Sequence, residues 1–241
     1  MPYQSADPAA AGAITARGWT LVLLSVACAF AVLSLSPPRV FGGVLLVIPA
    51  ALFTAIPLVT LHAMSSSGAR NLFRGYSLGA FGQSIMFGIA TLTASLSVAL
   101  ILLPFAPLEA NRAGDVLTNA DALAVVIFLV RTFIQLVGEE VVTILPLLAV
   151  VRFSMATTGI GRRGGLAAGV VVSTLLFSAM HLPTYNWNVV QCFVVIGTAR
   201  LVLTASYLRT GNLWVSSGAH IMNDWSIFAV GYAGSHLPIG A

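Results

Sequence analysis

Charged side chains are scarce in this chain, and lysine is absent altogether. Only 7% of the 241 residues are charged, whereas a soluble globular domain carries about 25%. Hydrophobic residues make up 58% of the chain, and the mean hydropathy is +0.97. This balance argues against a water-soluble fold and leaves no room for a separate soluble domain. We therefore expect an all-α, polytopic bundle of membrane helices.

Other features that would point elsewhere are also missing. The two cysteines, Cys28 and Cys192, lie in apolar segments, where small buried hydrophobic residues are the simplest interpretation, rather than a disulfide or a metal pair. The arginines are spread over loops instead of forming a polybasic arm, so nothing supports a nucleic-acid partner. The first apolar run ends without a small-residue cleavage site, and we interpret it as a retained helix.

Seven apolar runs are long enough to cross the hydrocarbon core of a bilayer, which takes roughly 20 residues. They cover residues 19–36, 40–64, 79–104, 121–151, 165–182, 185–208 and 212–232. The connections between them contain prolines, glycines and most of the charges. The sequence thus predicts about seven transmembrane helices.

The distribution of arginine predicts the orientation, because loops that stay in the cytoplasm collect positive charge. With the N-terminus inside, the outer segments hold two arginines, Arg39 and Arg112. The inner segments hold seven: Arg17, Arg70, Arg74, Arg152, Arg162, Arg163 and Arg209. We expect a multi-pass protein of the cell membrane with a cytoplasmic N-terminus.

Ionisable side chains also occur inside the predicted spans. They are Glu139, Glu140, Asp224, His181, His220, Arg131 and Arg200. A charge in hydrocarbon costs at least ~2.5 kcal/mol, and such residues usually face the bundle interior or a wet cavity. Any one of them could simply pair with another to hold two helices together. Their concentration in one part of the chain favours a functional site.

The spacing of these residues adds detail. His220 and Asp224 are four residues apart and share a helix face, whereas the adjacent Glu139 and Glu140 diverge by roughly 100°, so that one can face a site while the other supports it. Pro183 places His181 near the end of its helix. With straight, vertical helices, Glu139, His181 and His220 would lie about 20, 24 and 14 Å from the inner boundary, an uneven set of depths.

Three segments occur in an order that resembles a known family. They read GEEVVTILP, FSAMH and LRTGNLWVSSGAHIMND. The pattern EExxxR, FxxxH and an Arg-Thr-Gly turn before HxxxN or HxxxD is typical of the CAAX prenyl protease type II and bacteriocin-processing group, the CPBP or Abi family of intramembrane proteases. The resemblance covers residues 121–230. Together with the apolar runs, it predicts a division into a short tail (1–18), N-terminal transmembrane helices (19–120), protease-like catalytic helices (121–232) and a second short tail (233–241).

Two positions depart from the family pattern. Ile144 stands where the motif arginine is expected, so Arg131 or Arg200 would have to hold the glutamate pair. Arg200 is the better candidate, because Arg131 lies about 12 Å from Glu139 along the same helix and would need Gln135 or a water between them. Asp224 stands where many members have asparagine. An ionised carboxylate cannot donate to an oxyanion, so Asp224 would be protonated, bind a metal or orient His220.

The resemblance implies a catalytic set of Glu139, Glu140, His181, His220 and Asp224. In a metal-free version, Glu139 with His181 activates a water, His220 with Asp224 stabilises the oxyanion, and Glu140 supports the pair. In a zinc version, His181, His220 and Glu139 are ligands and the other glutamate is the base. No HExxH is present, so a metal would bridge separate helices. No cofactor is certain, and zinc is the candidate.

We expect a membrane-associated protein or peptide as substrate, and lipid as the surroundings. Two other classes of function stay open at this point. Ile144 motivates a catalytically inactive scaffold or immunity protein of the same fold. Buried carboxylates and histidines also serve as proton relays, so a proton-coupled transporter is a further alternative, although the chain shows no inverted repeats.

Overall fold

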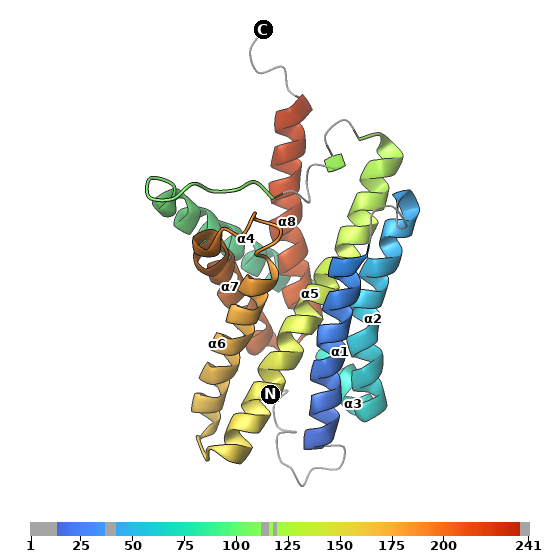
Figure 1. Cartoon of the computed structure of the whole chain (residues 1–241), viewed down its shortest axis with the longest axis vertical. Helices are drawn as coiled ribbons and strands as arrows, with labels where there is room; N and C mark the ends of the chain where they lie inside the picture. Colours follow the sequence, from blue (N-terminus) through green and yellow to red (C-terminus); the bar gives the residue numbers. More distant parts are fainter. Residues whose placement is uncertain (1–13, 37–41, 112–115, 118–119, 237–241) are drawn as a thin grey trace.

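The computed structural model describes residues 14–36, 42–111, 116–117 and 120–236, and it consists of long helices packed side by side (Figure 1). Two of the arginines used to predict orientation, Arg39 and Arg112, lie outside the described residues, as do most of the N-terminal tail and the last residues of the C-terminal one. The elements are α1 (Ala16–Leu35), η2 (Gly43–Leu46), α2 (Val47–Met64), α3 (Ser66–Leu72), α4 (Leu78–Leu102), α5 (Ala122–Thr157), α6 (Arg162–Met180), η4 (Gln191–Ile196), α7 (Gly197–Thr210) and α8 (Leu213–His236).

Local sequence explains where several helices begin and end. The side chains of Thr15, Ser65, Ser77 and Asp121 each accept a hydrogen bond from the backbone N–H three residues further on, at the starts of α1, α3, α4 and α5. Gly211 ends α7 in the left-handed conformation, with φ 61°, which a residue without a Cβ adopts easily.

Six helices are long and apolar enough to cross a membrane: α1, α2 with η2, α4, α5, α6, and η4 with α7. The predicted all-α, multi-pass membrane bundle is confirmed. The seventh predicted run, 212–232, is the long helix α8, which is not among the six and continues to His236. The predicted run at 185–208 begins only at Gln191, because residues 181–187 form turns. The connection between α2 and α4 contains the short helix α3, which the sequence did not predict.

The largest apolar core fills one end of the bundle. It joins Trp19 near the start of α1, Leu61 near the end of α2, Ile144 and Val151 in the second half of α5, and Tyr207 near the end of α7. All of these helix ends belong to the side where the arginine-rich connections lie. The middle of the bundle, by contrast, holds the buried charged residues, and they define the candidate site.

Candidate active site

Glu139 and Glu140 lie in the middle of α5 and point in different directions, as their spacing predicts. Glu140 is fully buried, and Glu139 is 8% exposed. One oxygen of Glu139, Oε1, accepts a hydrogen bond from Gln135 Nε2 at 3.0 Å, one helical turn earlier. The other, Oε2, has two histidines near it. Glu139 therefore points toward the two histidines, whereas Glu140 points into the packed interior between the helices.

Glu140 is held by Arg200 from α7. The guanidinium Nη1 and Nη2 donate to Oε1 and Oε2 at 2.6 and 2.9 Å, and neither side chain is exposed to solvent. Arg200 Nε donates to Thr204 Oγ1, and the guanidinium lies 5.2 Å from the Phe177 ring centroid. A two-pronged pair of this kind fixes the position of both groups. The prediction that Arg200 substitutes for the arginine missing at Ile144 is confirmed for this contact.

His220, on α8, connects the two glutamates. Its Nδ1 lies 2.9 Å from Glu140 Oε1, and because a carboxylate only accepts, we assign the hydrogen to Nδ1. Its Nε2 then points the other way, 3.8 Å from Glu139 Oε2 and 3.7 Å from Asp224 Oδ1. The imidazole is therefore anchored on its protein side and open on the side that faces Glu139.

His181 lies at the C-cap of α6, as Pro183 predicts. Its Nδ1 is 2.8 Å from the carbonyl oxygen of Phe177, so this nitrogen donates and Nε2 is left toward the site. Nε2 lies 3.8 Å from Glu139 Oε2, the same oxygen that His220 faces. Two imidazole nitrogens thus flank one carboxylate oxygen without touching it.

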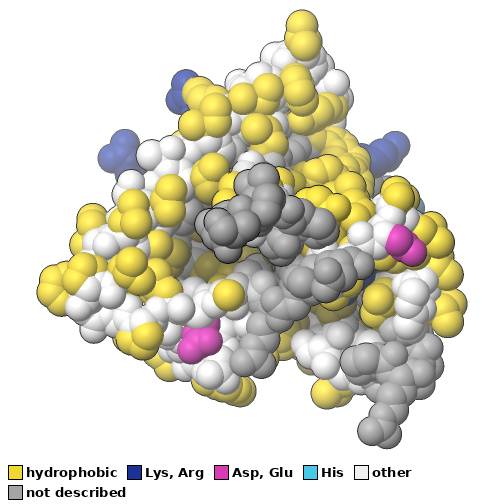
Figure 2. Space-filling model, turned by 90° about the horizontal axis from the view of Figure 1, so that it is seen from above, with side chains coloured by type: hydrophobic (Ala, Val, Ile, Leu, Met, Phe, Trp, Pro, Cys, Tyr) yellow, Lys and Arg dark blue, Asp and Glu magenta, His cyan; other side chains and the backbone are white. Residues whose placement is uncertain are grey.

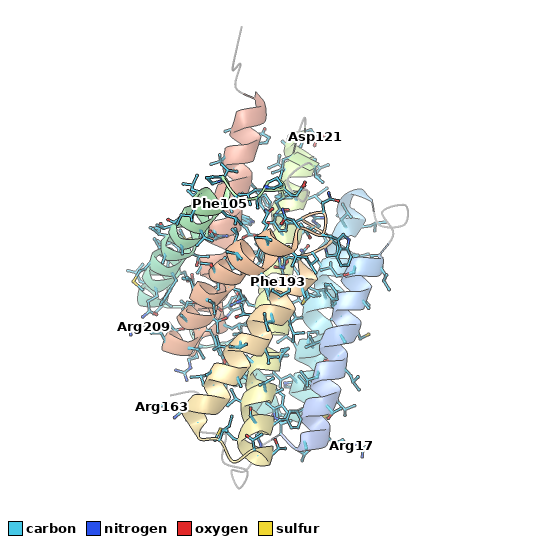
Figure 3. All side chains as sticks on the ribbon, turned by 60° about the vertical axis from the view of Figure 1, so that its left-hand side comes forward. Arg17, Phe105, Asp121, Arg163, Phe193 and Arg209 are labelled. Atoms are coloured by element: carbon cyan, nitrogen blue, oxygen red, sulfur yellow. The ribbon has the colours of Figure 1, made fainter. Side chains whose placement is uncertain are left out.

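The uneven depths predicted for Glu139, His181 and His220 are wrong, because the three side chains lie close together. The prediction assumed that all helices end at the same inner level. Figure 3 shows that Arg209, at the turn between α7 and α8, lies higher than Arg163, at the turn between α5 and α6. Helix α8 therefore starts closer to the site than α6 does. His220 reaches the level of Glu139 after only two turns of α8.

Asp224 has a neighbour that the sequence analysis missed. Asn223 is 6% exposed, and its Nδ2 donates to Asp224 Oδ1 at 2.9 Å. Asp224 thus accepts a hydrogen bond from Asn223 and lies close to His220 Nε2. Of the three roles considered for Asp224, this arrangement favours the one in which it orients His220. The sequence did contain a hint of this residue, because Asn223 directly precedes position 224, where the family pattern often has asparagine.

A cavity of about 330 Å³ borders this cluster, and Glu139 and Glu140 are not among the residues that line it. Its lining includes His181, His220, Asn223 and Asp224, and also Tyr185 from the turn after α6. Tyr185 lies over His181, with ring centroids 6.5 Å apart at 27°, and shares a hydrogen bond with the Asn111 side chain. Burial raises the pKa of Tyr185 well above its ordinary value, so the phenol keeps its proton and can donate. Tyr185, which follows His181 by four residues, was not among the site residues predicted from the sequence.

The comparison with known proteins bears on this cluster directly. Residues 121–226 match the family model described as Rce1-like, type II CAAX prenyl endopeptidase. This segment is similar to the Rce1-like family. The match contains all five predicted catalytic residues and Arg200, and it confirms the predicted relation to the CPBP or Abi proteases. No curated protein and no solved structure matches the chain.

Two further expectations for this segment concern Arg131, the weaker candidate for holding the glutamates, and the zinc ligands. Arg131 does not reach the glutamates: its guanidinium lies 5.6 Å from the Phe128 ring centroid, and its Nε has no hydrogen-bond partner among the described residues. In the part of the chain that the structure describes, no group of three or more His, Cys, Asp or Glu side chains is arranged as a metal site. The zinc ligand set of His181, His220 and Glu139 stays a prediction.

Proposed function

We propose that this chain is an intramembrane endopeptidase of the CAAX-processing or bacteriocin-processing type, in which Glu139 and His181 activate the attacking water. The observation that carries the proposal is the position of Glu139 Oε2, 3.8 Å from the Nε2 atoms of both His181 and His220. Hydrogen bonds between such groups span about 2.7–3.2 Å. The gaps are thus too long for direct hydrogen bonds, and we place the attacking water beside these three atoms, within reach of each.

The water would react as follows. Glu139, assisted by His181, takes a proton as the water oxygen bonds to the carbonyl carbon of the scissile peptide. His220, with Nδ1 anchored by Glu140, has its Nε2 toward the cavity, where a protonated imidazole donates to the developing oxyanion. The C–N bond then breaks, and Glu139 passes the proton to the departing amine. Asp224 orients His220, and Arg200 keeps Glu140 in place.

Arg200 is the reason for preferring an enzyme over an inactive scaffold. The scaffold hypothesis rested on Ile144, which leaves the glutamate pair without its usual cation. Because Arg200 supplies that cation from another helix, with both of its terminal nitrogens on Glu140, the support that the site needs is present. The loss of the arginine at position 144 therefore gives no reason to expect an inactive site.

The proposal is tested by adding a library of fluorogenic, membrane-anchored peptides to the purified full-length protein. We expect turnover by the wild type, and a loss of about a hundredfold or more in Glu139→Gln and His220→Ala, because each removes a group that acts on the reacting atoms. Asp121→Asn is the matched control, since Asp121 caps α5 far along the helix from Glu139. Full activity in Glu139→Gln, or no turnover by folded wild type across the library, would refute the proposal.

The same assay decides the question of metal. Activity that survives a strong zinc chelator, with the same dependence on Glu139, supports the metal-free version. If the chelator abolishes turnover and added zinc restores it, His181, His220 and Glu139 are instead the residues that would hold the ion.

A further inference from the structure

A second cavity, of about 300 Å³, lies between η2, at the start of α2, and the first part of α5. We call it the α2–α5 cavity, and its walls include the apolar side chains of Leu46, Leu123 and Ile127. It shares no described lining residue with the catalytic cavity. Phe128 lines the α2–α5 cavity and packs edge-on against Phe228, which lines the catalytic one, with ring centroids 5.1 Å apart. This aromatic pair separates the two cavities.

Arg131 is the only cation among the described residues that line the α2–α5 cavity. Its Nε is buried without a hydrogen-bond partner among the described residues, and its guanidinium lies 5.6 Å from the Phe128 ring centroid. None of the ion pairs in the described part of the chain includes it. Charged side chains inside membrane helices usually pair with another group, because an unpaired charge there is costly. Arg131 thus lacks the kind of partner that Arg200 has in Glu140.

The acidic side chain of the α2–α5 cavity does not supply this partner. Asp121 precedes Arg131 by ten residues, which is about 15 Å along α5. Its Oδ1 accepts a hydrogen bond from the backbone N–H of Ala124 and so caps the helix. An anion that pairs with Arg131 must therefore come from a bound molecule rather than from the described residues of the chain.

The depth of Arg131 matches the edge of a bilayer's hydrocarbon core. Glu139 lies at the middle of the 36 residues of α5, and Arg131 is eight residues, or about 12 Å, nearer the start of the helix. With the middle of α5 at the middle of a core about 30 Å thick, Arg131 lies about 3 Å inside the core's edge. Side chains of a helix tilt toward its N-terminus, so the guanidinium extends toward the lipid headgroups.

The α2–α5 cavity is also accessible from the lipid side. Leu123 lines it and is nevertheless 67% exposed, and Val130, next to Arg131, is 46% exposed. Figure 2 looks onto the end of the bundle where α5 begins, and arginine or lysine colour appears there only at the margins. That face therefore offers an anion few other cations.

The chemistry of the cavity selects among possible anions. A guanidinium donates through a planar fork that matches the oxygens of a phosphate group. Free phosphate would leave the apolar walls without a contact. A phospholipid has a phosphate and apolar chains in one molecule, which fits both the guanidinium and the walls.

We propose that the α2–α5 cavity binds a membrane phospholipid, with Arg131 donating hydrogen bonds to the oxygens of its phosphate. Leu46, Leu123 and Ile127 contact the apolar carbons next to the headgroup. The lipid supplies the charge that pairs with Arg131, and it connects the start of α2 with α5, the helix that carries Glu139. This inference does not depend on the proposed endopeptidase function.

Binding is measured by native mass spectrometry of the full-length protein, which is freed of lipid in a neutral detergent and titrated with dioleoyl phosphatidylglycerol. We expect Arg131→Gln to bind this lipid about fivefold or more weakly than the wild type, because it loses the charge-assisted hydrogen bonds. Arg163→Gln is the matched control and should bind as the wild type does, since it removes the same charge from an exposed position at the opposite end of the bundle (Figure 3).

A second variant keeps the test decisive if Arg131→Gln does not fold. Ile127→Trp retains Arg131 and adds volume to the wall of the α2–α5 cavity, so it should also weaken the binding of the lipid. Binding of phosphatidylglycerol at wild-type strength by Arg131→Gln, or by Ile127→Trp where Arg131→Gln does not fold, would overturn the proposal.

Two further ligands identify which part of the lipid is recognised. Dioleoylglycerol has the same chains without the phosphate, and inorganic phosphate has no chains. A ligand that binds the folded state raises the melting temperature, and we expect phosphatidylglycerol to raise that of the wild type more than either of these does. An equal rise with dioleoylglycerol indicates only an apolar groove, and an equal rise with inorganic phosphate indicates a site for free anions. Either result overturns the phospholipid site, and neither depends on catalytic activity.

Discussion

At the scale of single residues, the site depends on a buried ion pair assembled from two helices. Glu140 and Arg200 have no exposed side-chain surface, and among the described residues their charges are compensated by each other, by His220 and Thr204, and by the Phe177 ring. Removing one member of such a pair leaves an isolated buried charge and typically costs about 3–5 kcal/mol. The pair also orients His220, because Glu140 Oε1 is shared between Arg200 and the imidazole.

Because Arg200 and His220 share Glu140 Oε1, the site should respond to a substitution of Arg200 that changes the shape of the side chain and keeps its charge. Lysine carries one ammonium group and cannot make the two parallel hydrogen bonds of the guanidinium. We expect Arg200→Lys to lower kcat/KM about tenfold or more and to lower the melting temperature. Arg209→Lys, at an exposed position of the same helix, is the control and should change neither. A wild-type rate in Arg200→Lys would show that Glu140 needs only a nearby positive charge.

The sequence was most informative about these residues. It named all five proposed catalytic side chains and Arg200, because charges inside apolar helices are rare and therefore conspicuous. It missed Asn223 and Tyr185, because an asparagine beside an aspartate and a tyrosine after a proline are ordinary. Their roles depend on the arrangement of α8 and of the turn after α6, which no local pattern encodes.

At the scale of elements, the position of Glu139 depends on how closely α2 and α5 pack. A Cβ on Gly138 would overlap Thr54 Oγ1 and lie 2.6 Å from Phe53 Cδ1. Thr54 Oγ1 also donates to the carbonyl oxygen of Ile134 at 2.8 Å, which fixes the two helices together at this level. Glycine at position 138 thus permits the approach, and the next residue is the proposed base.

Gly138→Ala should therefore separate the helices and displace Glu139. Overpacking of this kind costs about 1–3 kcal/mol, so we expect a lower unfolding midpoint together with reduced kcat. Gly82→Ala in α4 is the matched control, because a Cβ there meets nothing within 4 Å and alanine is the better helix former. Thermal unfolding in detergent, compared between the two variants, checks this, and an unchanged midpoint in Gly138→Ala would contradict the packing argument.

Element boundaries show where sequence patterns stop being informative. Apolar runs located the long helices well, since hydrocarbon thickness sets their length. They did not distinguish the turns at 181–187 from the helix that follows, nor predict the π-helical segment η4, because both are apolar enough to continue a run. Helix α5 has 36 residues and is about 54 Å long. This length exceeds the hydrocarbon core of a bilayer, which is about 30 Å thick.

At the scale of the whole molecule, the large apolar core and the cavity lie in different parts of the bundle. Among the described residues, the large apolar core occupies the arginine-rich end, and the cavity beside the buried charges lies toward the other end, between α4, α6, α7 and α8. In the orientation predicted from the arginines, the site lies toward the outer side. From sequence alone, the orientation and the catalytic residues were separate predictions, and only the arrangement of the helices connects them.

The most direct test of the account is cleavage of a membrane-anchored peptide by the full-length protein in ¹⁸O-labelled water, with mass spectrometry of the products. Activation of a water by Glu139 predicts one ¹⁸O atom in the new carboxyl group, the same products from Asp121→Asn, and none from Glu139→Gln. Products formed at an undiminished rate by Glu139→Gln, or a new carboxyl group without ¹⁸O, would contradict it.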